Sequence, residues 1–188
     1  MYKRQIKDYP EQNYIAHGGG AIDGYNATNS LEAIDNAIAH GIKYIELDLQ
    51  LTADSILVAA HDWDSFAGMT GFKSPDNRPP TFEEFQKCRM WDRYTPVTYR
   101  MIDSIFTVHP DLILVTDKLD DAEILQKFLP GLTHRTMIEC FSEKAFDKIK
   151  NTGSSLLKDI QLSANKPVDW DVAFEPSKIC LLYTSDAA

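Results

Sequence analysis

Residues 44–51 alternate between apolar and polar side chains, which is the pattern of a β-strand with two different faces. Its odd-numbered positions are all Ile or Leu, and its even-numbered positions include Glu46 and Asp48. A period of two places these carboxylates side by side on one face, close enough to share a cation. A short turn and a second apolar run then lead to His61. This stretch is the centre of the candidate site.

Strand and helix patterns alternate along most of the chain at intervals of thirty residues or more. Asn29, with Glu32 three residues later, predicts a capping box at the start of the first helix. The other strands are expected at 14–16, 112–115, 136–141 and, more weakly, 156–162, and the other helices are expected to begin near Tyr99, Asp120 and Ser142.

This alternation predicts a parallel α/β architecture. A barrel would turn Glu46 and Asp48 towards its interior, whereas a doubly wound open sheet is the competing topology. The glycine run at 18–20 is too compressed for the dinucleotide-binding pattern that would favour the open sheet.

The regular pattern is lost between residues 63 and 94, which are rich in aromatic, Pro and charged residues. A short helix is expected to begin at Thr81. A loop of this length inside a compact domain is often functional. We interpret it as an insertion that acts as a lid or a substrate wall, with a simple surface excursion as the alternative.

The composition is that of one globular domain, with 188 residues, 44% apolar and 25% charged. A formal net charge of −9 argues against a nucleic-acid surface, but a bound cation would still allow a phosphate-containing substrate. The three cysteines have neither metal-site nor disulfide spacing. No apolar run is long enough to span a membrane, and residues 1–10 lack the apolar core of a signal peptide. We therefore expect a cytoplasmic location by default, although a parent protein could be exported.

Polar residues follow several of the expected strands, where sites form in parallel α/β folds. Carboxylates suit Mg²⁺ or Ca²⁺ better than zinc, and two histidines could serve as acid and base. Two acids on a buried strand face would be energetically unfavourable if they had no partner, and a bound cation would supply one. The candidates are His17, Glu46, Asp48, His61, Asp117, Lys118 and Glu139.

Four short motifs follow one another along the chain. They read Ala16-His17-Gly18, Asn29-Ser30-Leu31-Glu32-Ala33, Glu46-Leu47-Asp48-Leu49-Gln50-Leu51-Thr52 and His61-Asp62. Motifs in this order resemble the glycerophosphodiester phosphodiesterase family, whose pattern runs His-Arg-Gly, Glu-Asn-Thr, Glu-Leu-Asp-Val-x-x-Thr and His-Asp. The similarity extends over about residues 14–150, and its middle block is the most specific.

The resemblance implies a TIM (β/α)8 barrel that hydrolyses a phosphodiester with a divalent cation, Ca²⁺ or Mg²⁺. The implied substrate is a glycerophosphodiester or a lipid-derived headgroup, and the oligomeric state stays open. By matching position, the resemblance implies that Glu46, Asp48 and Asp117 bind the metal, that His17 and His61 form the acid–base pair, and that Lys118 contacts the substrate phosphate.

The chain departs from the family pattern at the first motif, where Gly18 replaces the arginine. Asp117 also stands directly beside Lys118, whereas the family's acid lies two residues before its lysine. We interpret these changes as marks of a divergent subgroup, related to phosphatidylinositol-specific phospholipases. Gly18 and Glu139 are then candidates for substrate contacts, although a buried hydrogen bond is the simpler role for Glu139.

We expect residues 1–179 to be the N-terminal four to five β/α units of one barrel domain. Residues 180–188 resemble a translated sequencing adapter, so we expect them to be a non-native tail, and the chain as given to be poorly soluble or inactive. Two alternative functions remain, a non-catalytic barrel that binds phosphate or glycan and a metal-dependent sugar-phosphate isomerase or aldolase.

Overall fold

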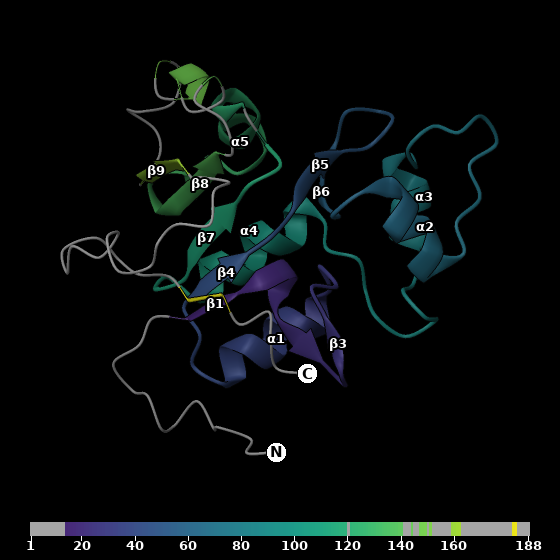
Figure 1. Cartoon of the computed structure of the whole chain (residues 1–188), viewed down its shortest axis with the longest axis horizontal. Helices are drawn as coiled ribbons and strands as arrows, with labels where there is room; N and C mark the ends of the chain where they lie inside the picture. Colours follow the sequence, from purple (N-terminus) through teal and green to yellow (C-terminus); the bar gives the residue numbers. More distant parts are fainter. Residues whose placement is uncertain are drawn as a thin grey trace, which may run out of the picture.

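The computed structural model describes residues 14–119, 121–140, 144, 147–149, 151, 159–162 and 182–183 (Figure 1). Its main sheet has six parallel strands in the order β10-β1-β4-β7-β8-β9. Their bounds are β1 (Tyr14–Ala16), β4 (Tyr44–Glu46), β7 (Ile113–Thr116), β8 (Thr136–Cys140), β9 (Asp159–Leu162) and β10 (Leu182–Tyr183).

The order of the sheet follows the chain from β1 to β9 without reversal. A doubly wound sheet would reverse its strand order at a switch point, so that alternative is wrong. Helices connect the successive parallel strands, and Figure 1 shows α4 beside β4 and β7. This is the arrangement of the N-terminal β/α units of a TIM barrel, as expected. The connecting helices are α1 (Leu31–Ala39), α4 (Tyr99–Val108) and α5 (Ala122–Phe128), and residues 144, 147–149 and 151 are also helical.

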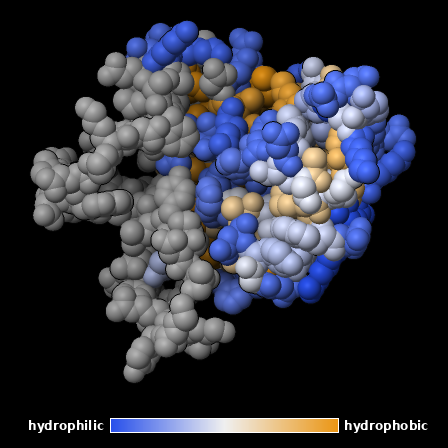
Figure 2. Space-filling model, turned by 45° about the vertical axis from the view of Figure 1, so that its right-hand side comes forward, coloured by the Kyte–Doolittle hydropathy of each residue, from blue (hydrophilic) through white to orange (hydrophobic). Residues whose placement is uncertain are grey.

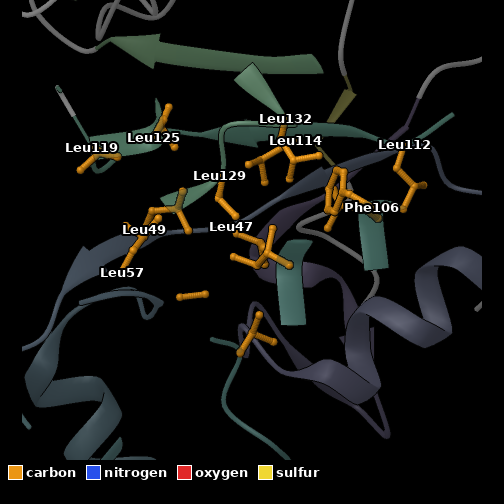
Figure 3. Packing of buried hydrophobic residues seen from close by; sticks show 14 of the residues in the cluster. Leu47, Leu49, Leu57, Phe106, Leu112, Leu114, Leu119, Leu125, Leu129 and Leu132 are labelled. Carbon is orange, nitrogen blue, oxygen red and sulfur yellow. The ribbon is translucent and has the colours of Figure 1, made fainter. Parts of the chain in front are cut away.

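Parallel register divides the sheet into two faces, because paired residues point to the same side. On the face covered by helices, Ile45 pairs with Leu114, and both belong to a large apolar cluster that includes Phe106 of α4 (Figure 3). On the opposite face, Glu46 pairs with Val115, which pairs with Met137. The carboxylate Glu46 therefore lies on the face that a barrel turns inwards, above buried apolar side chains.

The strand expected over residues 44–51 is interrupted in the middle. After β4 the backbone leaves the main sheet, and β5 (Leu49–Leu51) pairs antiparallel with β6 (Leu57–Ala59). The amide of Leu47 still donates to Val115 O at 3.0 Å, whereas the carbonyl of Asp48 accepts from Ala60 N at 2.7 Å. The alternation is correct, but it spans two sheets. The pattern does not reveal the break, because residues on both faces of this stretch are buried.

The segment expected to be a long loop contains two helices, α2 (Trp63–Thr70) and α3 (Phe82–Lys87). The second was expected, but the first was missed. Phe66 and Phe85 stack with ring centroids 4.8 Å apart, and they form a small apolar cluster with residues of β6 and its end. The insertion is therefore a folded unit, which Figure 1 shows beyond the β5–β6 hairpin.

The capping box predicted at Asn29 is wrong by one residue. Ser30 is the N-cap of α1, and its hydroxyl accepts from Ala33 N at 3.3 Å. The Asn29 side chain contacts Asp48, and Glu32 accepts instead from the backbone and hydroxyl of Thr95. At α5 the cap is Asp121, and the predicted Asp120 lies outside the described residues.

We expect Ser30→Ala to lower the free energy of unfolding by about 1 kcal/mol, the usual effect of losing an N-cap hydroxyl. The exposed Ser104 inside α4 is the matched control, because Ser104→Ala removes a hydroxyl without a capping role. Urea unfolding of both variants measures the difference. An equal effect at both positions would contradict the capping assignment.

The coloured surface in Figure 2 is mostly hydrophilic, in keeping with the net charge of −9. Among the described residues, no helix has the length and apolar character needed to cross a membrane.

Candidate active site

Three carboxylates converge at the ends of two neighbouring strands. Glu46 ends β4, Asp48 lies two residues further, and Asp117 follows β7. Glu46 pairs with Val115, so the ends of β4 and β7 lie side by side at this edge of the sheet. One oxygen from each carboxylate lies within 4.8 Å of the other two. The structure therefore brings together the three acids that the sequence predicted as metal ligands.

Each of these carboxylates has one oxygen without a hydrogen-bond partner among the described residues. These atoms are Glu46 Oε1, Asp48 Oδ1 and Asp117 Oδ1, and all three are buried. Glu46 and Asp48 are themselves only 1% and 0% exposed. Buried negative oxygens without donors are unfavourable, so a divalent cation fits this group.

The pKa of Asp117 reflects its burial beside the other two carboxylates. Burial raises the pKa of Asp117 to about 6, with further contributions from the charges of Glu46 and Asp48. Lys118 opposes the shift, since its Nζ lies 3.9 Å from Asp117 Oδ2 and 3.9 Å from Asp48 Oδ1. Without a cation, the group thus resists carrying three negative charges.

His17 begins the short 3-10 helix η2 (His17–Gly19) directly after β1. Its Nδ1 lies 3.0 Å from Glu46 Oε2, and its side chain is partly exposed. Interaction with Glu46 raises the pKa of His17, although burial opposes the shift. His17 is therefore joined to the carboxylate group through Glu46.

His61 approaches the group from the other side, after β6. Its Nδ1 lies 2.6 Å from Asp62 Oδ2, and Lys118 Nζ lies 3.4 Å from its Nε2. Asp62 also caps α2 by accepting from the amide of Ser65, which with the His61 contact holds the pKa of Asp62 well below its usual range. Lys118 thus stands between His61 and two of the acids.

Gly18 contributes its backbone and has no room for a side chain. Its amide donates to Glu46 Oε2 at 2.6 Å, and its φ of +54° is in the left-handed region. A Cβ at this position would lie 2.4 Å from Ala27 Cα. An arginine therefore cannot occupy position 18 unless this loop moves.

Glu139 of β8 is buried, and it follows Ile138, which pairs with Thr116, the residue before Asp117. Its charge contributes to the raised pKa of Asp117. The group of three oxygens within 4.8 Å does not include it. Its role as a substrate contact stays a prediction.

Sequence reasoning missed the role of Asn29. Its Nδ2 donates to Asp48 Oδ2 at 2.9 Å, and its Oδ1 accepts from Asp48 N at 3.0 Å. The signals in the sequence were an asparagine next to a second capping residue, Ser30, and its place in a motif that resembles the family pattern. Asparagine tolerates the left-handed backbone that Asn29 adopts, with a φ of +53°.

The model of the glycerophosphoryl diester phosphodiesterase family matches residues 20–171. This range contains the three acids, His61 and Lys118, whereas His17 precedes it. No curated protein matches the chain.

Solved structures with a similar fold include the glycerophosphoryl diester phosphodiesterase domain of a Mycobacterium tuberculosis protein, at 21% identity and a TM-score of 0.60, covering 81% of this chain and 59% of that one. A glycerophosphodiester phosphodiesterase from Agrobacterium tumefaciens has 20% identity and a TM-score of 0.55, covering 74% and 62%. One from Thermotoga maritima has 22% identity and a TM-score of 0.53, covering 75% and 59%.

These likenesses show the fold, and this chain spans about three fifths of the length of each of these structures. The family match covers most of the chain and the strand ends that carry the three acids. The chain therefore belongs to the glycerophosphoryl diester phosphodiesterase family.

Proposed function

We propose that the protein hydrolyses a phosphodiester with the help of a divalent cation. The observation that carries this proposal is the group of three buried carboxylates, each with one oxygen that lacks a donor among the described residues. Membership of the phosphodiesterase family supports the same chemistry.

Glu46, Asp48 and Asp117 are the residues that would hold the cation. When bound there, a divalent cation neutralises the phosphate charge and lowers the pKa of an attacking hydroxyl or water. Lys118 lies beside two of these acids and next to His61, which supports the proposal that its ammonium binds a phosphate oxygen.

The two histidines would move protons at the two ends of the reaction. In each, Nδ1 lies beside a carboxylate, Glu46 for His17 and Asp62 for His61, and Nε2 is the ring nitrogen that we assign to proton transfer. One histidine removes a proton from the attacking oxygen, and the other donates a proton to the leaving alkoxide. The order of these roles is open.

The proposed substrate is a glycerophosphodiester or a lipid-derived headgroup. A second candidate is a non-catalytic site that binds phosphate or a glycan. The observation that favours it is Gly18, because the arginine of the family pattern is missing and cannot be accommodated there.

The test is hydrolysis of glycerophosphocholine and bis(p-nitrophenyl) phosphate by the full-length protein, before and after removal of divalent cations with EDTA. We expect turnover that is lost with EDTA and restored by adding back Mg²⁺ or Ca²⁺. Monovalent salt at matched ionic strength is the control. Binding of the phosphodiester without turnover, at any cation concentration, would favour the non-catalytic site.

A further inference from the structure

We propose that the first βα loop, residues 17–30 between β1 and α1, makes the site selective for Mg²⁺ over Ca²⁺, with Asn29 as the main positioning residue. This inference rests on the proposed function, because it concerns the same three carboxylates. It follows from the way in which protein donors occupy one oxygen of Glu46 and one oxygen of Asp48.

The carboxylate of Asp48 is clamped by the carboxamide of Asn29. Two hydrogen bonds join them, Nδ2 to Asp48 Oδ2 at 2.9 Å and the Asp48 amide to Asn29 Oδ1 at 3.0 Å. Both residues are buried, with exposures of 0% for Asp48 and 2% for Asn29. Asp48 therefore presents only Oδ1 to a cation.

The carboxylate of Glu46 is fixed in the same manner from the start of this loop. The amide of Gly18 donates to Oε2 at 2.6 Å, and Nδ1 of His17 lies 3.0 Å from the same oxygen. Glu46 Oε1 has no donor among the residues that the structure describes. Glu46 thus also offers a single oxygen.

Asp117 completes the set. Lys118 Nζ lies 3.9 Å from its Oδ2, the same distance as from Asp48 Oδ1, and its Oδ1 has no hydrogen-bond partner in the described part of the chain. The loop therefore limits two of the three acids, Glu46 and Asp48, to a single oxygen each. Ca²⁺ takes six to eight oxygens and often uses a carboxylate in bidentate fashion, whereas Mg²⁺ requires six and usually keeps several waters. Two carboxylates that are each limited to one oxygen fit the smaller cation better.

The loop makes this restriction rigid. The amide of Asn29 donates to Gly18 O at 2.7 Å, so the residues that hold Glu46 and Asp48 are bonded to each other. Both have left-handed backbones, with φ values of +54° and +53°. Asp48 Oδ2 cannot become a second ligand atom without losing the Asn29 clamp, and a rigid site of this kind disfavours the larger cation.

The experiment measures Mg²⁺ and Ca²⁺ affinities of the cation-free full-length protein by isothermal titration calorimetry. The key variant is Asn29→Gly, which tolerates the left-handed backbone and removes the clamp. Asn26→Gly is the control, because Asn26 is an exposed asparagine between β1 and α1, in the short strand β3 (Tyr25–Asn26). Thermal melting without cations establishes that each variant is folded.

We expect the wild type and the control to bind Mg²⁺ more tightly than Ca²⁺. Asn29→Gly should weaken Mg²⁺ binding about 10- to 100-fold, as for other residues that orient a ligand, and weaken Ca²⁺ binding less. Tighter binding of Ca²⁺ by the wild type would overturn the inference while leaving the proposed function intact, and so would an unchanged Mg²⁺/Ca²⁺ ratio in a folded Asn29→Gly. Binding of neither cation by the wild type would overturn both.

Discussion

His17→Gln should lower kcat for phosphodiester hydrolysis by about 100- to 10,000-fold, the range that a general acid or base contributes. Glutamine keeps a polar side chain beside Glu46 but cannot exchange a proton near neutral pH. Since His17 reaches the carboxylates through Glu46 and is partly exposed, the loss should appear in kcat at saturating cation. Steady-state kinetics with bis(p-nitrophenyl) phosphate measure the effect.

The matched control is His40→Gln, because His40 is an exposed histidine at the end of α1 whose ring, within the described part of the chain, bonds to the backbone of its own helix. This change should leave kcat within about twofold of the wild type. Equal losses at His17 and His40, or full activity of His17→Gln, would rule out proton transfer by His17.

Asp117→Asn should make the cation-free protein more stable at pH 7 to 8 and should remove most of its stabilisation by divalent cations. In the folded protein the pKa of Asp117 is raised from 3.8 to about 6, chiefly by burial. The unfolded chain therefore releases this proton at lower pH than the folded one. An uncharged asparagine avoids the unfavourable charge, and it also loses an anionic ligand.

The contribution of Asp117 to the stability of the cation-free protein falls as the pH rises. Below pH 3.8 both states hold the proton, and the contribution of Asp117 to stability is at its most favourable. As pH rises through about 6 this contribution is lost, by up to about 3 kcal/mol for a shift of this size. The partial exposure of the group makes that figure an upper bound.

Chemical unfolding between pH 4 and 8, with EDTA and with excess Mg²⁺, tests this prediction. The exposed Asp103 of α4 provides the control variant, Asp103→Asn. The difference between wild type and Asp117→Asn should widen from pH 4 to 7 in EDTA and change sign in Mg²⁺. A constant difference across pH, or the same response from Asp103→Asn, would contradict the electrostatic description of the site.

The sequence predicted the parallel α/β order and the acids at the strand ends because both depend on local periodicity. Glu46 and Asp48 are two residues apart, so they point to the same face of a strand, and Asp117 follows the next buried strand. The break after β4 was not predictable in this way. Both faces of that stretch are buried, so the pattern does not tell one sheet from two.

The positions of Asn29 and Gly18 were harder to predict because their roles depend on tertiary contacts. Asparagine is common at helix N-caps, yet the carboxamide of Asn29 contacts an acid nineteen residues away. From the sequence, Gly18 shows only the loss of the arginine charge of the family pattern, whereas in the structure its backbone amide donates to Glu46. Helix α2 was missed because its sequence, with Gly68 and Thr70, lacks a clear apolar stripe and depends on stacking of Phe66 against Phe85.

The central claim is that Glu46, Asp48 and Asp117 together bind one divalent cation, and crystallography of the full-length protein with Mn²⁺ in place of Mg²⁺ tests it most directly. We predict one strong anomalous peak bounded by Glu46 Oε1, Asp48 Oδ1 and Asp117 Oδ1, the three buried oxygens without donors in the described structure. The absence of a peak there, with Lys118 instead bonded directly to these carboxylates, would contradict the account.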